Sequence, residues 1–162
     1  MADRSLAPVP RVGLGFDAHA WGGDRPLWLG GVHIEHDRGL AGHSDGDVVC
    51  HAVADALLGA VALGDVGEHF PDTDPSVAGI AGATLLARTV ALLAETGAAP
   101  VSVDVTVVCD HPPIAPHRSA MRLQLAAALG VSVERVSVKA TRPEGLGLSG
   151  DGAGCLAVAV VT

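Results

Sequence analysis

Aromatic side chains are almost absent from this chain. Only 2% of its 162 residues are aromatic and none is tyrosine, although 49% of the residues are hydrophobic. A hydrophobic fraction of that size excludes a disordered chain, and the length fits one domain whose core needs no disulfide bonds. The core must therefore consist of Ala, Val and Leu, and the 21 glycines allow backbones to approach one another closely.

Positive charge is also scarce, with 10 Lys and Arg residues against 18 Asp and Glu residues and a formal net charge of -8. This balance argues against a nucleic-acid partner, because phosphate backbones are bound mainly through Lys and Arg. It does not exclude a small phosphorylated ligand, whose charge a metal ion, a helix N-terminus and a few cations can neutralise locally.

Three further absences concern cellular location. Cys50, Cys109 and Cys155 lie in separate apolar runs and form no CxxC pair, which favours reduced thiols in the core of a cytoplasmic protein. Residues 1–11 contain charges and prolines and lack the apolar stretch of a secretion signal. No run approaches the roughly 20 apolar residues of a membrane span, so we expect no membrane partner.

Periodicity and turn residues predict a mixture of strands and helices. We expect a loose arm over residues 1–10. Residues 101–109 alternate as a strand does, and residues 47–63 have the length and apolar content of a helix, preceded by the N-cap types Ser44 and Asp45. The other expected strands are 11–17, 27–34, 135–140 and 155–161, and the other expected helices are 82–96 and 117–129.

These elements do not alternate strictly, as they would in a doubly wound parallel sheet. We therefore predict the α+β class, with a single domain over residues 1–162. It would be a two-layer sandwich in which a mixed β-sheet carries helices on one face. The other face would expose many Val and Ala side chains, so we expect neighbouring subunits to cover it.

Two short patterns indicate a metal site. In the segment Asp17–His19, alternation along an extended chain places a carboxylate and an imidazole on the same face. On the expected helix, Asp47, His51 and Asp55 are spaced four residues apart and stack on one side. This polar stripe of the helix could be an ordinary solvated face. Alternatively, His51 could be a metal ligand whose ring is oriented by one of the two carboxylates. Asp17, His19 and His51 together resemble the three-ligand set of catalytic zinc.

Three loops contain candidate ligands for a phosphorylated substrate. Residues 42–47 precede the helix, where N–H groups and the helix dipole favour an anion, and His43 and Ser44 could donate to phosphate. The acidic loop 64–75 suits polyol hydroxyls or a divalent cation, although Asp and Pro are also common turn residues. Arg142 is of the type that binds phosphate, and Glu144 could hold a hard cation such as magnesium.

Taken in order, these motifs resemble one enzyme family. GFDAH, AGHSDGDVVCHAVADALLGA, LGDVGEHFPDTDP, DVTVV and VKAT…EGLG are similar to blocks of the 2-C-methyl-D-erythritol 2,4-cyclodiphosphate synthases, over residues 11–161. The resemblance implies that 4-diphosphocytidyl-2-C-methyl-D-erythritol 2-phosphate is cyclised with release of CMP, in non-mevalonate isoprenoid synthesis. It also implies a homotrimer with its sheets toward the threefold axis and its active sites between subunits.

The resemblance implies roles for individual residues as well. Asp17, His19 and His51 would hold one zinc ion per subunit, and Glu144 would hold magnesium or manganese together with the substrate. His43 and Arg142 would be catalytic. All of these residues except His51 would also contact the substrate. Further contacts would come from Ser44 and from a methylerythritol loop that consists of Asp65, Val66, Gly67, Phe70, Pro71, Asp72, Thr73 and Asp74. The remaining contacts would come from Thr141, Pro143 and Leu148 and from a cytosine loop that consists of Cys109, Asp110, His111, Pro112, Pro113, Ile114 and Ala115.

The chain departs from the family pattern in three segments. Pro113 replaces the usual lysine of the cytosine loop, and Thr141-Arg142-Pro143 replaces a run of threonines, with Arg142 in the place of the second. The segment GDGAG at 150–154 replaces GRGEG, so that Asp151 stands in place of an arginine that helps to hold phosphate. Compared with the family pattern, the chain therefore lacks two cationic side chains, at positions 113 and 151, and gains one, Arg142. We hypothesise that Arg142 replaces the lost positive charge near the diphosphate.

Two other functions remain open at this point. The chain could hydrolyse or cyclise a different cytidyl or phosphorylated polyol substrate. Alternatively, it could be a non-catalytic trimer that binds metal and nucleotide, having lost catalysis through its altered loops. The presence of Asp17, His19, His51, His43 and Glu144 weighs against the second alternative.

Replacing Arg142 tests the hypothesis about its charge. Because the guanidinium would stabilise negative charge that develops on the diphosphate, Arg142→Thr is expected to lower kcat/KM by roughly 10²-fold. Steady-state measurement of CMP release gives both turnover and substrate affinity. If neither quantity changes, the hypothesis is rejected.

Overall fold

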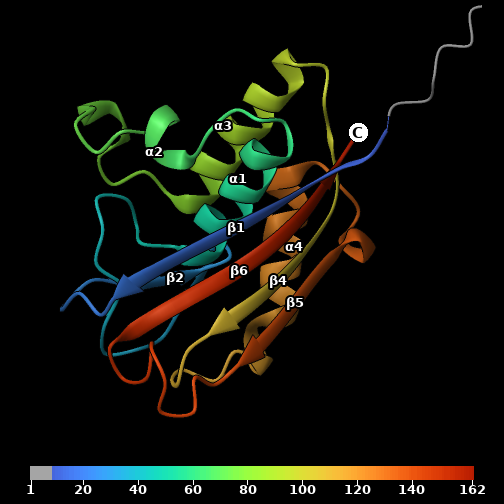
Figure 1. Ribbon diagram of the computed structural model, residues 1–162. Helices are drawn as coiled ribbons and strands as arrows, with labels where there is room; N and C mark the ends of the chain where they lie inside the picture. Colours follow the sequence, from blue (N-terminus) through green and yellow to red (C-terminus); the bar gives the residue numbers. More distant parts are fainter. Residues whose placement is uncertain (1–8) are drawn as a thin grey trace, which may run out of the picture.

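The computed structural model describes residues 9–162, in which a β-sheet carries helices on one face (Figure 1). The main sheet has the strand order β1-β6-β4-β5, formed by β1 (Arg11–Ala20), β6 (Gly152–Val161), β4 (Pro100–Val108) and β5 (Val136–Thr141). β6 is antiparallel to both of its neighbours, whereas β4 and β5 are parallel. The predicted α+β domain with a mixed sheet is confirmed.

Three long helices lie on the covered face: α1 (Val48–Ala60), α3 (Gly82–Glu95) and α4 (Arg118–Leu129). The connections contain the short helix α2 (Val66–His69) and the 3₁₀ turns Pro75–Val77, Ala115–His117 and Val133–Arg135. Helix α1 ends before the predicted residue 63, because Ala62 has a left-handed φ of 58° and the Leu63 N–H turns back to the Leu58 carbonyl. Among the described residues, no helix combines the length and the apolarity needed to cross a bilayer.

The segment 27–34 differs from its prediction as one strand. It forms a separate hairpin of β2 (Leu27–Leu29) and β3 (Val32–Ile34). Gly30 and Gly31 both have positive φ values, as a two-residue hairpin turn requires. The two glycines therefore reverse the chain instead of interrupting a strand.

The first and last strands are longer than predicted. β1 continues past Asp17 to Ala20 because it pairs along its whole length with β6, which begins at Gly152. The Asp17–His19 motif consequently lies within a strand. Of the predicted arm 1–10, residues 1–8 lie outside the described residues, and residues 9 and 10 are exposed.

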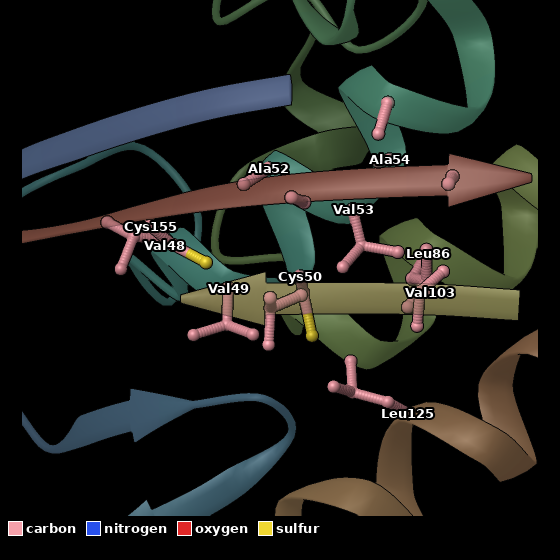
Figure 2. Packing of buried hydrophobic residues seen from close by; sticks show 14 of the residues in the cluster. Val48, Val49, Cys50, Ala52, Val53, Ala54, Leu86, Val103, Leu125 and Cys155 are labelled. Carbon is pink, nitrogen blue, oxygen red and sulfur yellow. The ribbon is translucent and has the colours of Figure 1, made fainter. Parts of the chain in front are cut away.

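The core between sheet and helices consists almost entirely of aliphatic side chains, as the scarcity of aromatic residues predicted. Figure 2 shows Val53 of α1, Leu86 of α3 and Val103 of β4 gathered in it, with Leu125 of α4 nearby. Cys50, Cys109 and Cys155 are buried and free. Burial, helped by the charge of Asp110, raises the pKa of Cys109 to about 11, so this thiol stays protonated at neutral pH.

Two glycines of β1 set the distance between this strand and α1. A Cβ atom on Gly13 would lie 1.9 Å from the Ala56 carbonyl oxygen, and one on Gly15 would lie 2.0 Å from the Ala52 carbonyl oxygen. No side chain fits in that space, so the backbones of strand and helix are in contact.

The second face of the sheet is uncovered in the single chain. Val12, Leu14 and Phe16 alternate with the β1 glycines and point away from the helices, with 56–68% of each residue exposed. Leu156 and Val158 of β6 pair with Phe16 and Leu14 and are also exposed. A contiguous apolar surface of this kind marks an interaction site.

Substitution of Gly15 tests the contact between β1 and α1. Gly15→Ala is expected to cost on the order of 1–3 kcal/mol of unfolding free energy, because its methyl group would overlap the Ala52 carbonyl. Gly59→Ala is the matched control on α1, where an added methyl meets nothing within 4 Å, and it is expected to add roughly 0.5–1 kcal/mol. Urea unfolding monitored by circular dichroism measures both. Equal stabilities of the two variants would contradict the close approach.

Candidate metal centre and adjoining cavities

Asp17, His19 and His51 lie together on the helix-covered side of the sheet. Oδ2 of Asp17 is 3.0 Å from Nε2 of His19 and 3.0 Å from Nδ1 of His51. One ligand atom from each residue lies within 4.8 Å of the other two. The structure thus brings together the three residues predicted as metal ligands, while the identity of the metal stays a prediction.

The donor set suits a divalent cation such as zinc. Two imidazole nitrogens point at one carboxylate oxygen, and this combination of nitrogen and oxygen donors is one that zinc accepts. Burial opposes ionisation of Asp17, but hydrogen bonds from His19 and His51 outweigh it and hold the pKa of Asp17 well below its usual range. The hydrogen bond to Asp17 raises the pKa of His19, although desolvation acts against it. Asp17 is therefore anionic at neutral pH and suited to ligate a cation.

Asp47 fixes the start of the helix that carries His51. Its carboxylate is fully buried and accepts hydrogen bonds from the N–H groups of Val49 and Cys50, each at 3.0 Å. It also accepts from Gly30 at 2.8 Å and from Gly31 at 2.7 Å, so it ties the β2–β3 turn to α1. Asp47 is therefore the N-cap, in place of the predicted Ser44 or Asp45.

Ser44 holds the second ring nitrogen of His51. Its Oγ lies 3.0 Å from Nε2 of His51 and accepts a hydrogen bond from the Gly46 N–H at 3.1 Å. When Nδ1 of His51 serves as the ligand atom, the ring proton is on Nε2 and is donated to Ser44. The hydroxyl then has both acceptor positions filled and keeps its own proton free for a ligand.

Asp55 positions the next loop and does not orient the His51 ring, contrary to the prediction for the helix stripe. Its Oδ1 accepts a hydrogen bond from the Val66 N–H at 2.8 Å. Asp65 caps α2 by accepting from the Glu68 N–H at 3.0 Å. Burial raises the pKa of Asp55. Asp55 therefore attaches the acidic loop to α1, and Asp65 fixes the first turn of α2 within that loop.

A cavity of about 510 Å³ opens beside the three candidate ligands. Its wall contains four aspartates and, among the described residues, neither Lys nor Arg. Such a wall repels phosphate unless bound cations neutralise it. The predicted residues in this wall are Asp17, His19, His43, Ser44, His51, Asp65, Val66, Gly67, Phe70 and Asp72. Gly42, from the predicted loop 42–47, also lies in this wall. The sequence patterns did not single out the apolar wall of Val77, Ile80 and Leu85, because apolar residues beside a site resemble any core residues.

A second cavity, of about 180 Å³, lies where β4 and β5 end. The predicted residues that line it are Cys109, Asp110, Pro112, Pro113, Ile114, Ala115, Thr141 and Arg142. Arg118 and Ala140 complete the wall and had not been predicted. Arg142 therefore lines the second cavity of the single chain and is absent from the wall of the first.

Seven predicted residues line neither cavity: Pro71, Thr73, Asp74, His111, Pro143, Glu144 and Leu148. Asp74 caps the turn Pro75–Val77 by accepting from the Ser76 N–H. Glu144 is exposed and has a left-handed φ of 54°. Non-glycine residues in that conformation are strained and are often found at functional sites.

Comparison with known proteins connects this geometry to one family. The model of the YgbB family matches residues 10–162. A protein of Idiomarina loihiensis named 2-C-methyl-D-erythritol 2,4-cyclodiphosphate synthase is 52% identical over 153 residues, which cover 93% of this chain and 96% of the relative.

Some relatives are longer. A bifunctional enzyme IspD/IspF of Caulobacter vibrioides is 53% identical over 156 residues, which are 96% of this chain but only 41% of that protein. The chain therefore spans about two fifths of the length of such relatives. Among solved structures, a 2C-methyl-D-erythritol-2,4-cyclodiphosphate synthase in a CDP-bound form superposes with a TM-score of 0.87 at 34% identity, covering 94% of this chain and 100% of that chain.

The contact between Ser44 and His51 predicts a change in metal affinity. Loss of the hydroxyl leaves the His51 ring and its tautomer unrestrained, so Ser44→Ala is expected to weaken zinc binding by roughly 10- to 100-fold. Competition with a chromogenic chelator measures this affinity without reference to activity. Ser44→Thr, which keeps a hydroxyl, is expected to retain most of it, and Ser119→Ala on the exposed side of α4 serves as control. Wild-type affinity in Ser44→Ala would contradict the role assigned to this contact.

Proposed function

Because the chain belongs to the YgbB family, we propose that it converts 4-diphosphocytidyl-2-C-methyl-D-erythritol 2-phosphate to 2-C-methyl-D-erythritol 2,4-cyclodiphosphate and CMP, a step of non-mevalonate isoprenoid precursor synthesis. The observation that carries this proposal is the convergence of Asp17, His19 and His51 beside a cavity with His43 and Ser44 in its wall. That arrangement suits a ligand with several phosphate groups.

The proposed reaction is an intramolecular phosphoryl transfer. An oxygen of the 2-phosphate forms a bond to the β-phosphorus, the bond from that phosphorus to the bridging oxygen breaks, and the electron pair leaves with CMP. No outside nucleophile or base is required. The residues of the protein must therefore hold two phosphates in line and balance their charge. Positioning and charge stabilisation together account for most of the acceleration in such reactions.

Particular side chains would help to neutralise the negative charge of the substrate phosphates. Asp17, His19 and His51 would hold one zinc ion per subunit, and Glu144 a magnesium or manganese ion, which when bound supply the positive charge that the acid-lined cavity lacks. His43 is exposed at the cavity and can donate a hydrogen bond to a phosphate oxygen near the reacting centre.

The two cavities would bind different parts of the substrate. Asp65 and Asp72 in the first cavity offer carboxylates to the hydroxyls of the methylerythritol unit, beside Phe70. The remaining loop residues from Val66 to Asp74 would complete that contact. The second cavity, with the residues from Cys109 to Ala115, would hold cytosine. The relative solved in a CDP-bound form supports binding of a cytidine nucleotide. Arg142 lies in that cavity, where its guanidinium can reach a diphosphate.

We propose that the active protein is a homotrimer of this single domain, in the cytoplasm. The apolar surface of Val12, Leu14, Phe16, Leu156 and Val158 would face the threefold axis. Each active site would then combine the first cavity of one subunit with the second cavity of its neighbour. The separation of the predicted residues into two cavities supports this arrangement.

Turnover of the authentic substrate tests the proposed function. After chelation the protein should be inactive, and zinc together with magnesium should restore CMP release and a cyclic product whose two phosphorus nuclei are coupled in the ³¹P NMR spectrum. His51→Ala is expected to lower turnover by roughly 10² to 10³-fold, because one ligand of the charge-stabilising ion is lost. His33→Ala on β3, where the imidazole packs at an inclined angle against Trp28, is the control. Two uncoupled monophosphates would indicate hydrolysis, and CDP binding without CMP release would indicate a non-catalytic protein.

A further inference from the structure

Arg25 follows the end of β1 and reaches the turn that carries His43 and Ser44. Its Nη1 donates a hydrogen bond to the Gly42 carbonyl at 2.7 Å, and its Nη2 donates to the Ser44 carbonyl. These carbonyls flank His43, so one planar guanidinium spans the turn from end to end. No sequence pattern pointed to this residue.

The loop that carries Arg25 is itself fixed. The Gly22 N–H donates to the Gly39 carbonyl at 2.8 Å, and the N–H groups of Arg25 and Gly39 both donate to the Gly23 carbonyl, at 2.9 and 3.3 Å. A Cβ atom on Gly39 would lie 2.8 Å from Cγ of Arg25, so Gly39 packs directly on the stem of the side chain. Both the backbone and the aliphatic stem of Arg25 are therefore fixed, and this limits the positions that its guanidinium can take.

The carbonyl groups of the turn are all occupied. Arg25 binds those of Gly42 and Ser44, and the His43 carbonyl accepts from the Gly79 N–H at 2.7 Å. Because a trans peptide unit directs its N–H opposite to its C=O, fixing the Gly42 carbonyl also fixes the direction of the His43 N–H. Within the described part of the chain, the N–H groups of His43 and Ser44 donate to no acceptor. Both residues line the first cavity, so these donors remain available to a ligand.

We propose that Arg25 is a positioning residue for phosphate binding, which fixes the turn 42–44 so that His43 and Ser44 can donate to a phosphate group of the substrate. The identity of that group rests on the proposed function. Arg25 does not line the first cavity, and two of its donors are bound by carbonyls, so it acts through the turn without touching the ligand. This distinguishes it from Arg142, which lies in a cavity wall.

Kinetics of three variants test the proposal. In Arg25→Met, which keeps the stem and loses the donors, kcat is expected to fall on the order of 10²-fold through misplacement of the turn, with KM changed by less than about threefold. Arg25→Lys should recover part of kcat, because an ammonium group can still bind a carbonyl but cannot bridge two as a planar fork. Arg38→Met removes a neighbouring cation that lies over Trp21 and should leave kcat unchanged.

A measurement independent of activity accompanies the kinetics. Hydrogen exchange of a peptide covering residues 42–46 should accelerate at least tenfold in Arg25→Met, and not in Arg38→Met, while peptides of α1 and α3 keep their wild-type exchange. Wild-type exchange in this peptide together with wild-type kcat would overturn the proposal. Accelerated exchange across the whole chain, with a lowered Tm, would also overturn it by showing a general role in stability. If the wild-type protein does not turn over the substrate, the proposed function fails, and the exchange data alone then decide the role of Arg25.

Discussion

The contact between the backbones of β1 and α1 determines the geometry on which the candidate site depends. Gly13 and Gly15 face the helix with no side chain between them and the carbonyls of Ala56 and Ala52. Asp17 follows on the same face of the strand, and His51 precedes Ala52 on the helix. Strand and helix are thus close enough for a carboxylate and an imidazole to meet at 3.0 Å, a distance that longer side chains at the two glycines would not permit. The two glycines of β1 are therefore required for Asp17, His19 and His51 to come together.

The negative charge of the first cavity determines what can bind there. The first cavity has four carboxylates in its wall and, among the described residues, neither Lys nor Arg. Arg25 binds backbone carbonyls instead, and Arg142 lines the second cavity. A polyphosphate can enter such a cavity only together with positive ions. In the proposed function, Asp17 serves as a metal ligand, and all four carboxylates oppose phosphate binding in the absence of metal.

Local periodicity was enough to predict the three residues that the structure brings together as a candidate metal centre, but not the contacts that orient them. Asp17 and His19 share a face because a strand has a period of two, and His51 was visible because polar residues at helical spacing stood out in an apolar segment. The partner of the His51 ring was assigned to Asp47 or Asp55, whereas Ser44 holds it, because that choice depends on how the chain turns into α1. Residues 27–34 were predicted as one strand, although the positive φ values of Gly30 and Gly31 make a hairpin. Arg25 could not be predicted, since its partners are carbonyl groups, which every residue possesses and no side-chain pattern marks.

One of the three candidate metal ligands is distant in sequence from the other two. His51 and Asp17 are separated by 34 residues and lie on elements that meet only when α1 packs on β1. A zinc finger differs, since its ligands are close in sequence and capture of the ion drives a short chain to fold. Here the unfolded chain offers only the weak Asp17–His19 pair, so high affinity appears after the helix has docked. Loading is therefore expected to be a late event in maturation, and the bound ion then favours the native ensemble by mass action.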